Sequence, residues 1–212
     1  MRQKLLVKSK KLSFDYLISS SYEINNKIKA SNFIIKPSFT LLEKNTSTFL
    51  EKELFKIAFV VSKKFDHKFL NTQKNKNDLN LNFNKDCVNI EDIAKNYFDQ
   101  LKKELNIKFD DKKIVNLSSV QVQRGFVDRA TYTFDNKIIL STESRFSSVH
   151  RHYNLNLSDK ENKNLYKKCS IDHGHEYEIR IFLKKIINNN SDNKFFDLSK
   201  LKNVLQKKTL KA

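Results

Sequence analysis

Apolar and polar residues alternate in several stretches of this chain, and a period of two predicts strands with one buried face. The clearest example places apolar side chains at every second position from Tyr177 to Leu183. Further strands are predicted over Leu5–Ile24, Phe33–Leu42, Ile114–Gln123 and Ala130–Phe134, with another strand beginning at Lys137 after a turn at 135–136. Because Pro37 has no amide proton, we expect its strand to be an edge strand or to carry a bulge.

Two other stretches show the helical spacing of three and four residues. The apolar positions of the first are Leu50, Leu54, Ile57, Ala58, Val61 and Phe65, and those of the second are Ile90, Ile93, Ala94, Tyr97, Leu101 and Leu105. Asn89 is suited to cap the second helix, with Asp92 completing the cap. A third amphipathic helix is predicted at Asp197–Leu205, and polar loops are predicted at 72–85 and 186–194. The chain is therefore expected to belong to the α+β class.

Four of the five histidines lie within the 26 residues from His150 to His175, in a strand–long loop–strand arrangement. His173 and His175 leave the same face of a strand, and an antiparallel neighbour can bring His150 opposite them. Three imidazoles form a zinc site whose fourth position is open, as in catalytic centres. Cys169 lies four residues before His173, where it can face that position. His152 is the alternative ligand, and three surface histidines with a buried thiol are the alternative to any metal site.

Composition narrows the partners that the chain can bind. Lys and Arg total 41 against 24 Asp and Glu, which gives a formal net charge of +17. A basic surface favours anionic ligands, either a triphosphate or a nucleic acid. Nucleic acid is the weaker alternative, because no helix-turn-helix or RNA-binding aromatic motif is found, and solvated lysines account for most of the charge. Two cysteines exclude a disulfide framework, and no signal-like or membrane-spanning run occurs, so we expect a cytoplasmic protein without membrane contact.

The histidine-rich stretch resembles a known enzyme superfamily. FSSVHR, LSDKENKNLYKKC and HGHEY are similar to the zinc-binding half of the 6-pyruvoyltetrahydropterin synthase and 6-carboxytetrahydropterin synthase superfamily. The resemblance implies a tunnelling-type β-β-α-α-β-β module, in which an antiparallel sheet carries two helices on one face. It also implies that His150, His173 and His175 bind Zn²⁺ and that Cys169 is the catalytic cysteine.

Three further segments bear on the same resemblance. DHKFLN is similar to the family's D-H-K-x-L-N, which implies that Asp66 and His67 are catalytic. VNIEDIA is similar to P-T-x-E-N-I-A and implies that Glu91 binds substrate, although an acidic residue there also stabilises the helix dipole. VQVQRGF has Arg124 where the family has the glutamate that holds the pterin, and arginine cannot accept those hydrogen bonds. A one-residue difference in register is the alternative at this position.

Module boundaries follow from these segments. Residues 1–136 are interpreted as a degenerate synthase module that lacks the zinc half but keeps Asp-His, and residues 137–212 as the first, β-β-α half of a second module. By resemblance, the chain is expected to be a homo-oligomer with active sites at module interfaces.

The resemblance implies a zinc-dependent lyase acting on 7,8-dihydroneopterin triphosphate. The product would be either 6-carboxy-tetrahydropterin, as in queuosine biosynthesis, or 6-pyruvoyl-tetrahydropterin. A non-catalytic zinc- or pterin-binding scaffold subunit is the alternative that Arg124 favours, and a basic RNA-associated protein is a third hypothesis.

Overall fold

A computed structural model describes residues 9–24, 27–42, 47–70, 83, 88–109, 115–187 and 198–209. In chain order the elements are β1 (Ser9–Ser13), β2 (Tyr16–Ile24), β3 (Lys27–Leu42), α1 (Thr48–Lys63), α2 (Ile90–Phe109), β4 (Val115–Arg124), β5 (Asp128–Thr133), β6 (Lys137–His150), α3 (Asp159–Tyr166), a 3-10 helix (Lys167–Ser170), β7 (His173–Ile186) and α4 (Leu198–Thr209). This is an α+β chain, as the sequence predicts. The predicted loop 72–85 and Cys87 lie, apart from Phe83, outside the described residues.

The chain divides into two compact units. Unit 1 comprises residues 1–141 and 182–194, and unit 2 comprises residues 142–181 and 195–212. The strands follow the order β1-β3-β4-β5-β6-β7, with β2 also paired to β3. All pairs from β1 to the start of β6 are antiparallel.

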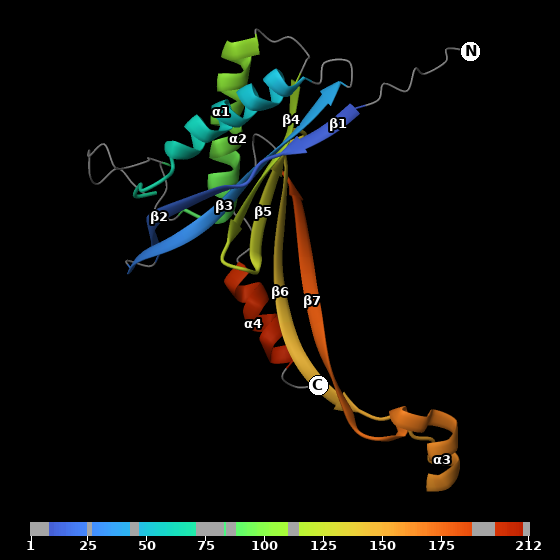
Figure 1. Ribbon diagram of the computed structural model, residues 1–212. Coiled ribbons are helices and arrows are strands. Elements are labelled where there is room, and N and C mark those ends of the chain that lie inside the picture. Colours follow the sequence, from blue (N-terminus) through green and yellow to red (C-terminus); the bar gives the residue numbers. More distant parts are fainter. Residues whose placement is uncertain are drawn as a thin grey trace. The chain divides into compact units, whose positions relative to one another are not determined.

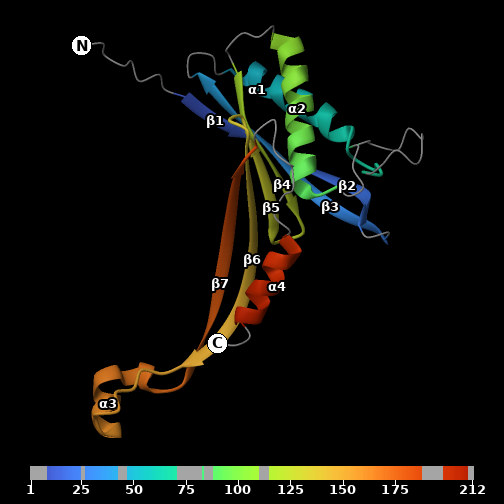
Figure 2. The same cartoon turned by 180° about the vertical axis from the view of Figure 1, so that it is seen from behind.

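In unit 1 both helices cover one face of the sheet, which Figures 1 and 2 show from opposite sides. The apolar positions that the sequence predicts to face inward are buried in both helices, apart from Ile57. Ser47 caps α1 by accepting the Leu50 amide at 3.1 Å. At the start of α2 the Asp92 carboxylate accepts the Asn89 amide at 3.0 Å, which is the reciprocal bond expected for that cap. The core lies between these helices and alternate residues of β2 to β5.

Pro37 lies in an internal strand, and of the two predicted alternatives, an edge strand or a bulge, the structure confirms the bulge. On one side of β3 the partner changes from β2, which ends its pairing at Ile35, to β1, which begins at Ser38. On the other side the register with β4 shifts between Ser38 and Phe39. The missing amide proton of proline therefore falls where no ladder bond to β1 or β2 is made.

Unit 2 comprises the paired portions of β6 and β7 together with α3 and α4. Cross-strand contacts set the register of this ribbon: Phe146 stacks on Tyr177 with ring centroids 5.2 Å apart, and Arg145 binds Glu178 at 3.2 Å. Because the two strands run antiparallel, residue numbers rise along β6 as they fall along β7. Counting from the Phe146–Tyr177 pair therefore places His150 opposite His173. Among the described residues of unit 2, Leu205 is the one large apolar side chain that is buried. Unit 2 therefore depends on strand pairing and local polar contacts more than on an apolar core.

None of the helices in the described part of the chain is long and apolar enough to cross a membrane.

Candidate metal centre

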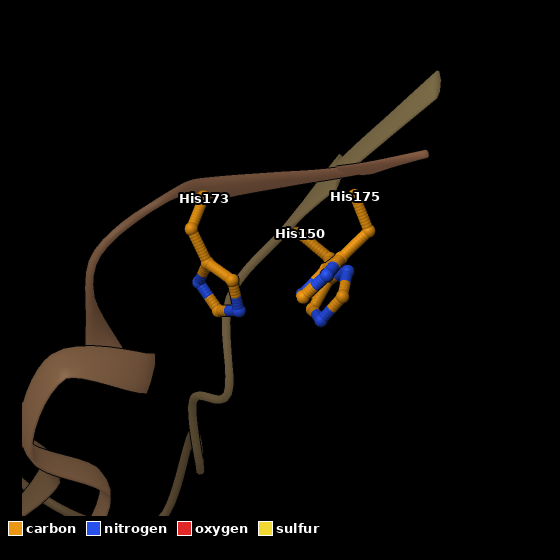
Figure 3. Close-up of side chains that lie close together, drawn as sticks. All are labelled: His150, His173 and His175. Carbon is orange, nitrogen blue, oxygen red and sulfur yellow. The ribbon is translucent and has the colours of Figure 1, made fainter. Parts of the chain in front are cut away.

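Three imidazoles meet where β6 ends and β7 begins (Figure 3). His150 is the last residue of β6, and His173 and His175 lie near the start of β7, two residues apart on one face. Their ring centroids are 4.7 to 4.9 Å apart. One nitrogen from each ring lies within 4.8 Å of those of the other two. The structure thus brings together the three residues that the sequence indicates as ligands.

The donor set fits a zinc ion. With Zn–N bonds of about 2.1 Å in tetrahedral geometry, the nitrogens would lie about 3.4 Å apart, a separation within the 4.8 Å limit that the three ligand atoms meet. His173 Nδ1 lies 2.8 Å from the Ile171 carbonyl oxygen, so its N–H donates there and Nε2 is left to bind a metal. Exclusion of water by its surroundings, followed by the nearby rings of His173, His175 and His152, lowers the pKa of His150. The neutral imidazole that a metal requires is therefore favoured at pH 7.

Cys169 lies on a short helical turn that precedes His173 in the sequence. The turn Lys167–Ser170 follows α3 directly, and the Cys169 side chain is exposed. The Cys169 carbonyl accepts the His152 amide at 2.8 Å, which ties the turn to the chain just beyond β6. Cys169 is not a member of the histidine cluster. The role of Cys169 as the catalytic cysteine stays a prediction.

The segment between the two strands was predicted as a long loop, and this prediction is wrong for residues 159–170. Ser158 and Glu161 form a capping box, because the Ser158 hydroxyl accepts the Glu161 amide and the Glu161 carboxylate accepts the Ser158 amide. The S-D-K-E sequence carries this signal. The helix has eight residues and only one buried side chain, so it has no apolar stripe by which the pattern would reveal it.

That buried side chain, Asn162, organises the segment. It is 1% exposed, and its carboxamide oxygen accepts the Asn154 amide at 2.7 Å. Its nitrogen donates to the carbonyl oxygens of Asn154, Leu157 and Ser158 at 3.0 to 3.1 Å. Sequence reasoning missed this residue, because a single asparagine carries no signal of its tertiary contacts.

Asn162→Ala is expected to loosen the segment that carries Cys169. The substitution removes the hydrogen bonds of the carboxamide to the main chain of Asn154, Leu157 and Ser158, each worth about 0.5–1.5 kcal/mol. Hydrogen exchange of amides in residues 154–170 should accelerate, while residues 90–105 of unit 1 keep their protection. Asn164→Ala, an exposed change on the same helix, is the control. Equal protection in both variants would show that Asn162 does not hold the segment.

Asp66 and His67 form a hydrogen-bonded pair in unit 1. His67 Nδ1 lies 3.0 Å from the Asp66 carboxylate, which leaves the Nε2 atom of an 81% exposed side chain available. Burial acts to raise the pKa of Asp66, but hydrogen bonds outweigh it and lower that pKa. These bonds come from the Ser19 amide, Lys63 and His67. The carboxylate is therefore ionised near pH 7 and can orient the imidazole.

The main chain holds this pair along the edge of β2. The His67 amide donates to the Ser19 carbonyl at 2.7 Å, and the Leu70 amide donates to the Ser21 carbonyl at 2.7 Å. Between these bonds Ser21 donates to Lys68 at 3.0 Å. His67 has φ of 55°, a left-handed conformation that non-glycine residues adopt only when the surroundings impose it. A hollow of about 560 Å³ lies beside His67, between β2, β3 and residues 67–69.

Glu91, the predicted substrate contact, and Arg124, which stands in place of the family's glutamate, both lie in unit 1. Glu91 is 3% exposed in the first turn of α2, and its role in substrate binding stays a prediction. Arg124 donates to the Asp128 carboxylate at 3.1 Å across the β4–β5 hairpin. Burial, the largest influence, acts to lower the pKa of Arg124, but Asp128 and Tyr22 raise it above its ordinary value. Arg124 is therefore a fixed cation within the fold.

Comparison with known proteins yields a relative of the predicted kind. The chain is 36% identical over 73 residues to the 6-pyruvoyl tetrahydrobiopterin synthase of Dictyostelium discoideum. The match covers 34% of this chain and 53% of the relative, so the chain spans about half the length of the curated relative that it matches. No protein-family profile matches the chain.

Comparison with solved structures finds three 6-pyruvoyltetrahydropterin synthase structures. Two Plasmodium vivax 6-pyruvoyltetrahydropterin synthase structures, one of them a catalytic-residue mutant, superpose with TM-scores of 0.46 and 0.45 at 14% and 15% identity. Each alignment covers 58% of this chain and 96% of the other chain. The Plasmodium falciparum enzyme superposes with a TM-score of 0.40 at 12% identity, over 59% of this chain and 91% of the other chain. The chain is thus similar, over 73 residues, to a 6-pyruvoyl tetrahydrobiopterin synthase.

Proposed function

We propose that this chain is a zinc-dependent pterin synthase of the lyase class. Its substrate would be 7,8-dihydroneopterin triphosphate, and its product 6-carboxy-tetrahydropterin, as in queuosine biosynthesis, or 6-pyruvoyl-tetrahydropterin. The observation that carries the proposal is the convergence of His150, His173 and His175 beside the turn that bears Cys169. The identity to a pterin synthase supports the substrate class. A cytoplasmic location is part of the same proposal.

Each group has a distinct proposed role. The three histidines would hold Zn²⁺, which when bound supplies Lewis-acid polarisation of side-chain oxygens of the substrate. Cys169 as thiolate would take a proton from a side-chain carbon of the substrate and later return it. His67, oriented by the Asp66 carboxylate through Nδ1, would give or take a proton at Nε2. Glu91 would contact the pterin.

We also propose that residues 1–136 and 137–212 are a degenerate module and a half module that complement one another in a homo-oligomer. Strands β2 and β3, helices α1 and α2, and strands β4 and β5 follow the β-β-α-α-β-β order. Strands β6 and β7 and helix α4 follow the β-β-α order, with α3 and the 3-10 helix inserted between the two strands. Asp66 and His67 fall in the first set, and the histidine cluster and Cys169 fall in the second. Neither set contains all of the proposed catalytic groups.

A non-catalytic zinc- or pterin-binding scaffold is the second candidate, and Arg124 favours it. This cation is satisfied within the fold by Asp128, whose side chain is 5% exposed. It cannot accept hydrogen bonds from a pterin. Metal analysis of the purified protein, combined with a turnover assay on dihydroneopterin triphosphate, separates the candidates. Zinc with turnover supports the enzyme, zinc without turnover supports the scaffold, and absence of bound zinc contradicts both zinc-based hypotheses.

His67→Ala is expected to abolish turnover while zinc content and folding stay intact. The reason is that His67 is 81% exposed and therefore contributes little to packing, whereas a general acid–base group typically contributes about 10²- to 10⁴-fold to the rate. Lys68→Ala, one residue away, is the control. Full activity of His67→Ala would make the likeness at DHKFLN purely structural.

The same variant tests assembly. Inactive His67→Ala and Cys169→Ala chains, mixed under conditions where subunits exchange, should regain part of the activity if one chain supplies His67 and another Cys169. Absence of recovery after demonstrated exchange would contradict a site built between chains.

A further inference from the structure

His152 is the one histidine of the 150–175 stretch that the metal cluster does not include. It lies two residues beyond His150, and the two ring centroids are 5.7 Å apart in an edge-on arrangement. On its other side the His152 ring stacks on Tyr166, with centroids 5.8 Å apart and planes inclined by 27°. The His152 side chain thus lies between a proposed metal ligand and the end of α3.

The main chain of His152 also contacts the segment that carries Cys169. Its amide donates to the Cys169 carbonyl at 2.8 Å. Tyr166 is the last residue of α3, and the turn with Cys169 begins at the next residue. His152 therefore contacts the turn through its amide, at Cys169, and the residue just before the turn through its ring, at Tyr166.

The turn needs such contacts because its own conformation is strained. Lys167, between Tyr166 and Cys169, has φ of 48°. A lysine in this left-handed region persists only where surrounding contacts determine the backbone. The described segment around Cys169 has no buried apolar side chain to supply them. The His152–Tyr166 stack and the His152 amide bond act on either side of Lys167.

We propose that His152 is a positioning residue, which fixes the Cys169 thiol relative to the three-histidine metal site. The inference rests on the proposed function, in which Cys169 moves a proton on a substrate held at the metal. A displacement of about 1 Å can cost about 100-fold in rate in such a step. His152 acts through its ring contact and amide, so an aromatic ring without nitrogens should serve in its place.

Two substitutions separate ring contact from imidazole chemistry. His152→Phe keeps a ring to stack on Tyr166, and His152→Ala removes it, while both keep the amide bond to Cys169. The experiment uses the full chain with Cys87→Ser, a nitroxide label on Cys169 and Cu²⁺ bound to the histidine cluster. Paramagnetic relaxation of the label reports the spread of distances between thiol and metal and requires no catalytic activity.

The expected result is a narrow distance distribution in the parent and in His152→Phe, and a broad one in His152→Ala. Turnover of the unlabelled chains should fall about 10- to 100-fold in His152→Ala, in kcat rather than KM, and be restored in His152→Phe. Tyr166→Leu should reproduce the His152→Ala effect, and the double variant should be no worse than either single one, because the two rings form one contact.

Three results would overturn the proposal. An unchanged distribution in His152→Ala would show that the ring does not hold the turn. Equal broadening in His152→Phe would assign the effect to the imidazole nitrogens, and loss of bound Cu²⁺ in His152→Ala would make His152 a ligand. Absence of turnover in the parent contradicts the proposed function alone, because the distance measurement still tests the positioning role.

Discussion

Replacing His173 with alanine is expected to reduce the zinc content from one ion per chain to a small fraction of that value. A site with three protein ligands binds zinc weakly when one of them is removed. Even the loss of a group that only hydrogen-bonds to a ligand typically costs about 10- to 100-fold in metal affinity. His173 is the most informative choice, because its Nδ1 donates to Ile171 and its Nε2 is thereby left for the metal. Metal analysis after dialysis against a weak chelator measures the effect.

The matched control for this experiment is His152→Ala. It removes another histidine ring close to His150 but one that lies outside the cluster. It should keep one zinc per chain, and circular dichroism should show that both variants are folded. Zinc content that is unchanged in His173→Ala would contradict the assignment of the site, and loss of zinc in His152→Ala would bring this histidine into the ligand set.

Cys169→Ser is expected to keep its zinc and to lose about 10²- to 10⁴-fold in turnover, the range typical of general acid–base groups. The hydroxyl is similar in size to the thiol but far less acidic, so it cannot provide a thiolate-like base near pH 7. Since Cys169 is exposed and lies outside the histidine cluster, its loss should change neither folding nor metal binding. Steady-state kinetics and metal analysis of the same preparation are the measurements.

Cys87→Ser serves as the control for cysteine replacement and should retain both zinc and activity. Loss of zinc in Cys169→Ser would identify the thiol as a fourth ligand and the centre as structural. Full activity of that variant would remove Cys169 from the mechanism, and with it the argument for catalysis at this turn.

Periodic burial explains which elements the sequence could predict. Helices α1 and α2 follow the predicted spacing because each buries one continuous stripe, from Leu50 to Val61 and from Ile90 to Leu105. Strands β4 and β5 are likewise found close to the predicted ranges. Where burial is slight the pattern fails: α3 buries only Asn162, so its stability comes from a capping box and tertiary hydrogen bonds that hydrophobic spacing does not record.

In the candidate site, too, some features could be predicted from the sequence and others could not. The spacing of His173 and His175, together with the strand expected to contain His150, indicated from the sequence which residues could share a metal, because a strand fixes the face on which alternate residues lie. The resemblance at FSSVHR and HGHEY indicated the chemistry. The register that places His150 opposite His173 depends on cross-strand partners such as Phe146 and Tyr177, which one strand's pattern cannot specify.

The sequence by itself determined the α+β class, the helix faces and the identity of the histidines, since each depends on local periodicity or residue chemistry. Only the tertiary structure decided that Pro37 lies where β3 changes partners, that Asn162 organises the segment before Cys169, and that Arg124 is bound by Asp128. These contacts depend on residues outside the segment's own periodic pattern, and their geometry exists only once the strands and turns have packed.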